Sequence, residues 1–291
     1  DALSAEGDIV SEGVVNFKNI QLQLAKKTLT ASGKVSYKDD DVAIDALIGA
    51  TNIAASEVKL LWPEGVAPLT REWVTENITE GTVPDASVKL NIQFGDLAKP
   101  VLPREAVDAA INLKDATIRY LPEHPSVSKV NAVIRIDGIS LYADISSADY
   151  MKATKLSTGK LTIDDLNLDN PYIKLSFDAN TTAKDVVHLL RLPRLEHAKH
   201  LNLDSDTVDG TGTAHAELGF FFFTPKDEQG KPLADDGMVY SVQGEMKNIT
   251  APAFMNKFDI KNGDGKISVD TKQITFDGSG IVNGANAAHA N

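Results

Sequence analysis

The chain has 291 residues, of which 42% are hydrophobic and 24% are charged, and its net charge at pH 7 is −12. This composition is typical of a folded protein and is too apolar for a disordered one. The acidic charge argues against binding to nucleic acid and against electrostatic docking on anionic lipid surfaces, because both require a basic surface. Cysteine is absent, which excludes disulfides, thiolate catalysis and iron–sulfur clusters.

The first predicted helix lies at residues 68–77. Thr70 is predicted to be its N-cap, and Leu69 and Val74 have the spacing of a hydrophobic staple around that cap. Gly81 is expected to end the turn that follows. The result is a short helix of about two turns in a chain that is otherwise rich in strand patterns.

Most of the remaining chain alternates apolar and polar residues with a period of two, which predicts strands with one apolar and one polar face. Asp137-Gly138 is a favoured hairpin turn, and Asn262-Gly263-Asp264-Gly265 and Asp277-Gly278 are predicted as further turns. The spacing of about ten residues between strands predicts an antiparallel meander. The apolar positions of these strands and of the adjoining aromatic run are Val88, Leu90, Ile92, Phe94, Ile111, Leu113, Ile118, Val130, Ile134, Ile136, Leu141, Ile145, Leu161, Ile163, Ile173, Leu175, Phe177, Leu218, Phe220, Phe222, Ile267, Val269, Ile274 and Phe276.

A second helix is predicted at residues 182–192, where valines and leucines form an apolar face and Pro193 ends the helix. The run Phe220–Phe223 places aromatic rings on both faces of a strand, so we expect a cover over one face, and the second helix is a candidate. Two interpretations remain open for this run: a fully buried core strand, or a strand with one face lining an apolar ligand channel.

Enzyme signatures are absent from the sequence: it has no nucleophile elbow, no P-loop and no H-E-x-x-H motif. Asp259–Asp270 mimics a calcium loop, but Ile260 and Thr271 stand where the first and last carboxylate ligands belong, so a hairpin turn is the better interpretation. His197 and His200 are interpreted as surface histidines, because a metal site needs further ligands. We therefore predict no catalytic residues, no metal and no cofactor.

One segment carries a more specific pattern. Between Leu61 and Val83 the chain has Trp62, Pro63, Arg71, Trp73, Asn77 and Gly81 at the spacing of an L-W-P…R-x-W-(V/I)-x-x-N-(I/L)-x-x-G signature. This segment resembles bacterial AsmA-like proteins of the YhdP type. The likeness extends over about residues 57–225, through a Y-x-P-x-x-P segment and the hairpin at 130–145.

The resemblance implies a cell-envelope protein of Gram-negative bacteria, whose parent chain is anchored in the inner membrane and extends through the periplasm. It implies a long curled antiparallel sheet, a β-groove, with one or two short helices. The apolar positions given above would line the groove and carry phospholipid acyl chains between the inner and outer membranes. The motif residues Trp62, Pro63, Arg71, Trp73, Asn77 and Gly81 are assigned a structural role: the tryptophans pin the helix to the sheet, and Arg71 bridges to a carboxylate.

The apolar runs are too short to span a bilayer, so we expect an excised segment with any membrane anchor outside it. We expect residues 1–291 to form a single elongated unit. Two alternatives remain open: a closed β-sandwich that binds other envelope proteins without carrying lipid, and a glycan-acting enzyme with two converging carboxylates. A groove lined by aliphatic side chains and the core of a sandwich both require alternation, so the sequence pattern alone does not separate them.

Overall fold

The computed structural model describes residues 2–11, 13–62, 68–99, 101–121, 123–166, 168–192, 203–233, 237–254 and 256–290. Its strands are β1 (Ala2–Ser11), β2 (Val14–Leu24), β3 (Lys27–Lys38), β4 (Asp41–Ala54), β5 (Ile78–Ile92), β6 (Val107–Ile118), β7 (Val127–Asp137), β8 (Ser140–Tyr150), β9 (Thr154–Ile163), β10 (Tyr172–Thr182), β11 (Asp209–Phe221), β12 (Val239–Phe254), β13 (Phe258–Asp270), β14 (Ile274–Val282) and β15 (Ala285–Ala290). The helices are α1 (Val58–Leu61), α2 (Pro68–Asn77) and α3 (Ala183–Leu189), with 3-10 turns η1 (Ala55–Glu57) and η2 (Arg104–Ala106).

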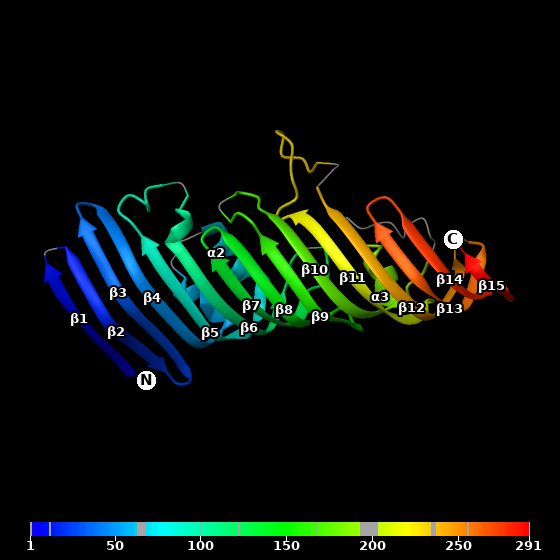
Figure 1. The fold of residues 1–291 in the computed structure, drawn as a ribbon, viewed down its shortest axis with the longest axis horizontal. Coiled ribbons are helices and arrows are strands. Elements are labelled where there is room, and N and C mark those ends of the chain that lie inside the picture. Colours follow the sequence, from blue (N-terminus) through cyan, green and yellow to red (C-terminus); the bar gives the residue numbers. More distant parts are fainter. Residues whose placement is uncertain are drawn as a thin grey trace. The chain divides into compact units, whose positions relative to one another are not determined.

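The strands form one sheet whose order follows the sequence from β1 to β15 (Figure 1). Over the described residues this sheet is not closed, because β1 and β15 stand at opposite ends of the strand order. The predicted antiparallel, mainly β fold is therefore confirmed, and the closed sandwich is not what the structure shows. In the part of the chain that the structure describes, three α-helices accompany the sheet where one or two were predicted, the additional one being α1 with its four residues.

The chain divides into two compact units. The N-terminal unit comprises Asp1–Ile118, Lys129–Asp144 and Thr162–Pro171. The C-terminal unit comprises Arg119–Ser128, Ile145–Leu161 and Tyr172–Asn291. Each unit is described separately below.

In the N-terminal unit, the strand register aligns apolar residues across neighbouring strands. Ala31 of β3 lies opposite Ile48 of β4, Ile48 lies opposite Val88 of β5, and Val88 lies opposite Ala109 of β6. Because directly opposed residues point to the same face of a sheet, these side chains share one face. The alternation that predicted strands thus becomes a row of apolar side chains running across the sheet.

The other face of the same strands is polar. Lys34 lies opposite Asp45, and Lys89 lies opposite Asp108. Opposite charges at directly paired positions stabilise strand pairing and resist a shift in register. A shift by one residue would also carry the apolar row to the wet face, so the register of these strands is strongly specified.

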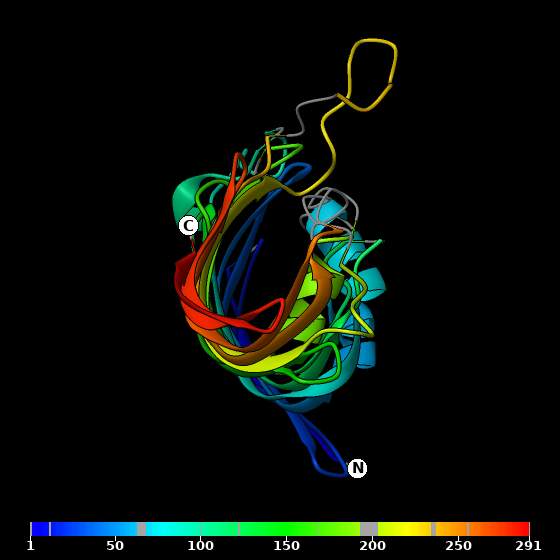
Figure 2. The same cartoon turned by 90° about the vertical axis from the view of Figure 1, so that its right-hand side faces the viewer.

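The C-terminal unit has the same two-faced construction. Leu175 of β10 lies opposite Leu218 of β11, which lies opposite Tyr240 of β12. Val242 of β12 lies opposite Val269 of β13, and Val269 lies opposite Ile274 of β14. Figure 2 shows that the yellow to red strands of this unit are curved along their length.

The predicted turns have mixed outcomes. The hairpin at Asp137-Gly138 is confirmed between β7 and β8, and Gly138 has a φ of +62° and donates its N–H to the carbonyl of Val107 at 2.9 Å. The turns predicted at residues 262–265 and 277–278 are wrong, because these residues lie inside β13 and β14. At the first of these places Asn262 has a φ of +48° and the register shifts, which identifies a β-bulge.

The first predicted helix exists, but its start and its end differ from the prediction. α2 begins at Pro68, so Thr70 lies in its first turn and is not the N-cap. Proline suits this position because it has no N–H to leave unbonded. Gly81 does not end a turn: it lies within β5 with a φ of +109°, and a Cβ there would lie 2.6 Å from the Cα of Ala116.

The second helix, α3, is shorter than predicted and follows β10 without a loop. Thr182 is its N-cap, with the side-chain oxygen accepting the N–H of Asp185 at 3.2 Å. Pro193, His197 and His200 lie outside the described residues.

The aromatic run at residues 220–223 is split between a strand and a loop. β11 ends at Phe221, so the predicted lining residue Phe222 lies in the loop that follows. Phe220 is buried, while the ring of Phe221 packs edge-on against Tyr172 at a centroid distance of 5.1 Å. Residues 222–233 then continue into the loop that projects from the sheet (yellow in Figure 1).

Candidate functional site

The candidate site in the N-terminal unit is an extended apolar surface built by six strands. We call it the N-terminal apolar face and define it by residues that the register places on one side: Leu3, Ala5, Val15, Phe17, Ile20, Leu22, Leu29, Ala31, Val35, Ile44, Ala46, Ile48, Ala50, Ala86, Val88, Leu90, Ile92, Val107, Ala109 and Ile111.

Parts of this face are open to solvent. Leu3 is 72% exposed, Val15 39% and Ile48 37%, whereas Ala46 and Ile92 are buried. Single exposed apolar residues are ordinary, but these three stand on one face among partly buried aliphatic side chains such as Leu29 and Val88, and an apolar surface of this extent is suited to binding something apolar. The site therefore offers hydrophobic contact along its length.

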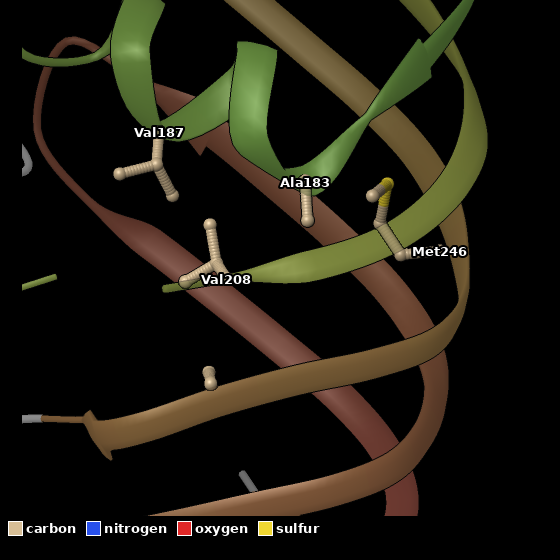
Figure 3. Packing of buried hydrophobic residues seen from close by; sticks show 5 residues of the cluster. Ala183, Val187, Val208 and Met246 are labelled. Atoms are coloured by element: carbon tan, nitrogen blue, oxygen red, sulfur yellow. The ribbon is translucent and has the colours of Figure 1, made fainter. Parts of the chain in front are cut away.

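The C-terminal unit carries a second such surface, the C-terminal apolar face. It consists of Ile173, Leu175, Phe177, Ala216, Leu218, Phe220, Tyr240, Val242, Met246, Ile267, Val269, Ile274 and Phe276. Here α3 lies against the sheet, so this surface differs from its counterpart in the N-terminal unit. In Figure 3, Ala183 and Val187 of α3 point toward Val208 and Met246.

Two clusters of buried side chains fix α3 on this face. In one, Ala183 and Val187 join Val208, Met246 and Ala251, with Ile267 packed against them. In the other, Leu190 joins Tyr240 and Val269; the partly buried residues around this second cluster are Val186, Leu189, Leu218, Met238, Val242, Ile267 and Ile274. Of the predicted lining residues, Leu218, Ile267, Val269 and Ile274 therefore contact neighbours in the clusters that α3 forms.

Polar bonds hold the first turn of α3. The buried carboxylate of Asp185 accepts the N–H of Ala153 at 3.0 Å and the hydroxyl of Thr154 at 2.9 Å, both from the start of β9 and the turn before it. Since an unpaired buried carboxylate is costly, these bonds fix where the helix begins.

A hollow of about 760 Å³ lies on the polar side of the C-terminal unit. Asp178 and His215 share a hydrogen bond of 2.8 Å there, and Thr158 donates to Asp178 at 2.8 Å. The bond with His215, followed by that from Thr158, lowers the pKa of Asp178 below its ordinary value. Among the described residues no group of three or more His, Asp or Glu side chains has a geometry that would hold a metal ion.

The predicted lining residues are distributed over both units. Val88, Leu90, Ile92 and Ile111 lie on the N-terminal apolar face. Phe94 lies in the turn after β5 rather than in the strand. Leu113, Ile118, Val130, Ile134, Ile136, Leu141, Ile145, Leu161 and Ile163 lie in β6–β9, with Leu113, Val130 and Ile163 buried. Whether any of these residues contacts lipid stays a prediction.

Sequence reasoning missed the contribution of β1–β4 to the N-terminal apolar face. Ile20, Leu22, Leu29, Ile44 and Ile48 all belong to it. A signal was available, because Leu29-Thr-Ala31 and Ile44-Asp-Ala46 alternate in the same way as the strands that were identified.

The residues of the family motif are placed around α1 and α2. The guanidinium of Arg71 donates to the carbonyl oxygens of Trp62 at 2.9 Å and of Lys59 at 3.2 Å, so it satisfies carbonyls at the end of α1. The side chain of Asn77 donates to the carbonyl of Trp73 at 3.0 Å. The bonds from Arg71 join α2 to the end of α1. The structural role assigned to the motif and a bridge from Arg71 to a carboxylate both stay predictions. Pro63 lies outside the described residues.

Within the described ranges, no helix has the length and apolar character needed to cross a bilayer. No curated protein and no solved structure matches the chain. The family model described as YhdP protein matches residues 6–283, a span that includes the segment with the motif and nearly all of the strands described above. The chain therefore belongs to the YhdP family of AsmA-like proteins.

Proposed function

We propose that the chain is a segment of a cell-envelope protein that carries phospholipid acyl chains on its N-terminal apolar face, between the inner and outer membranes. We propose further that it acts in the periplasm, without catalysis, and that its parent chain is anchored in the inner membrane. The observation that carries the proposal is the exposure of aliphatic side chains at Leu3, Val15 and Ile48 on a face shared by six strands.

The chemistry of such a surface suits acyl chains. Each buried methylene contributes about 0.8 kcal/mol, so a long acyl chain is held by area alone and needs no polar recognition. The polar face, with its opposed Lys34–Asp45 and Lys89–Asp108 pairs, keeps the other side of the sheet in water. Membership of the YhdP family supports an envelope setting for this chemistry.

One observation favours a second candidate function for part of the chain. In the C-terminal unit α3 packs on the apolar face, as it would in a structural or interaction module whose apolar residues form an ordinary core. The lipid-carrying function and the structural or interaction function differ in whether lipid contacts the apolar face of the sheet.

Native mass spectrometry of the purified chain, followed by lipid extraction, tests the proposal, and the expected result is co-purified phospholipid. Residue-level contact is tested with p-benzoylphenylalanine in place of Phe17, which lies on the N-terminal apolar face, or of Leu47, which lies opposite Ser32 and Lys89 on the polar face. Phospholipid should crosslink at Phe17 and not at Leu47. Absence of lipid in extraction together with no crosslink at Phe17 would overturn the proposal.

A further inference from the structure

We propose that α3 is a displaceable cover, and that phospholipid acyl chains compete with it for the C-terminal apolar face. This inference rests on the proposed function, because it names what controls access to lipid in the C-terminal unit. The N-terminal apolar face would then be open at all times, whereas the C-terminal apolar face would open only when α3 leaves it.

The first support is that α3 and lipid would use the same side chains. Leu190 packs with Tyr240 and Val269, and the surrounding shell includes Leu218 and Ile274. An acyl chain lying across β11–β14 would meet these same residues, since the register places them on one face. The helix and a lipid therefore cannot occupy this surface together.

The second support is that the contacts of α3 with the sheet are replaceable. Its cluster partners Val208, Met246 and Ala251 offer dispersion and hydrophobic contact, which is non-directional and which an acyl chain supplies equally well. At seven residues, α3 is also too short to be a stable helix by itself, so its helical state depends on this packing.

The third support is the unequal fastening of the two ends of α3. Asp185, in the first turn, is held by directional bonds to Ala153 and Thr154. Toward the other end, Val187 and Leu190 are held by apolar packing. The directional side-chain bond described near that end, from the guanidinium of Arg191 to the carbonyl of Leu203 at 3.1 Å, is exposed to solvent. This distribution lets the end near Leu190 leave the sheet while Asp185 stays bound, so α3 would pivot about its N-terminal end.

The experiment places p-benzoylphenylalanine at Phe276, which lies on the C-terminal apolar face opposite Ile267, and separately at Phe17 as the reference in the N-terminal unit. Each full chain is illuminated with vesicles of phosphatidylethanolamine and a minority of phosphatidylglycerol. Adding Leu190→Gln, which weakens the packing of α3, should raise lipid crosslinking at Phe276 several-fold and leave crosslinking at Phe17 unchanged. The matched variant His188→Gln changes an exposed residue of α3 and should alter neither.

A converse experiment locks α3 in place. The chain has no cysteine, so Val187→Cys with Val208→Cys introduces one pair, within the cluster shown in Figure 3. Oxidation should abolish crosslinking at Phe276, and reduction should restore it. Hydrogen–deuterium exchange on the unaltered chain gives a measurement that needs no variant: the amides of α3 should exchange faster when the vesicles are added.

The outcomes separate this inference from the proposed function. If lipid crosslinks at neither Phe17 nor Phe276, the proposed function fails and the inference fails with it. A different result would overturn only the inference. In that result lipid crosslinks at Phe17, crosslinking at Phe276 is unchanged by Leu190→Gln and by the disulfide lock, and the amide exchange of α3 is unchanged by the vesicles. The helix α3 would then be a permanent part of the core.

Discussion

Ile48 and Leu47 are neighbours in β4 that point to opposite faces, and they allow the proposed lipid surface to be tested by a single charge. Ile48 lies opposite Ala31 and Val88 on the N-terminal apolar face, and it is 37% exposed. In Ile48→Glu, a carboxylate would stand in the middle of that row. We expect this variant to lose lipid and to lose only part of its stability.

The magnitudes follow from burial. Fully burying an aliphatic side chain contributes about 1.5–3 kcal/mol, and Ile48 is partly exposed, so Ile48→Glu should lower the free energy of unfolding by about 1–2 kcal/mol. A hydrated carboxylate would also keep two or three methylenes of an acyl chain off the surface. At about 0.8 kcal/mol for each methylene, the affinity for that chain should fall by roughly 2 kcal/mol, which is about thirtyfold.

The matched control is Leu47→Glu. Leu47 is 52% exposed on the polar face and lies opposite Lys89, which would face the new carboxylate. Its free energy of unfolding should stay within about 0.5 kcal/mol of the unaltered chain, and its lipid occupancy should not change.

Urea unfolding measures stability, and native mass spectrometry measures lipid occupancy over a range of lipid concentrations. The reasoning is refuted if Ile48→Glu keeps its lipid at near-native stability. It is also refuted if both variants lose lipid equally, because the two faces of the sheet would then not differ in function.

Three further outcomes follow from local structure. Gly81→Ala should lower the free energy of unfolding in urea by about 2–4 kcal/mol, since it adds a steric clash to a positive φ. The control Gly95→Ala, with a φ of +83° and open space around its Cβ position, should lower it by about 1–2 kcal/mol. Equal losses would contradict the close approach at Gly81. Burial, followed by the neighbouring Tyr150, raises the pKa of Tyr120 above its ordinary value of about 10, so the stability linked to its neutral form is present below about pH 10 and is lost as the pH rises further. Tyr120→Phe should therefore flatten the fall in unfolding free energy on the alkaline side, and an unchanged slope would refute this origin. Thr182→Ala removes the N-cap of α3 and should lower the free energy of unfolding by about 1 kcal/mol; the amides of α3 should exchange faster than in the unaltered chain while those of β10 change less, and unchanged exchange in α3 would contradict the capping role.

The strands were predictable from the sequence, and several of the turns were not. Alternation depends on local residue order, and it located strands such as β10 because one face of each strand is apolar. The turns predicted at Asn262-Gly263 and Asp277-Gly278 were wrong because the residue types that favour a turn also suit a β-bulge or a close approach between backbones. A Cβ at Gly278 would lie 2.4 Å from the carbonyl oxygen of Asp264, so glycine is needed there within a strand.

The residues against which α3 packs could not be predicted from the sequence, for a different reason. The apolar side of residues 183–190 indicates that the helix covers something. Its partners, however, are distant in the sequence: Val208 directly precedes β11, Met246 belongs to β12 and Val269 to β13. Such contacts depend on how the sheet bends back toward the helix, which is a tertiary property that no local pattern encodes. The helix was expected to cover the run Phe220–Phe223; in the described residues it packs near Leu218 of the same strand, and neither of its two clusters includes a residue of that run.

The strand order of this sheet has a consequence for how such chains change in length. Each strand pairs with the strands before and after it in the sequence, so a hairpin can be gained or lost without rethreading the rest. One added hairpin would extend the sheet by roughly 10 Å, two strand spacings of about 4.8 Å. A single added strand would reverse the direction of every later strand and move their loops to the opposite rim. Two strands are therefore the natural unit in which evolution, or a designer, would lengthen this protein while keeping each loop and helix on its own rim.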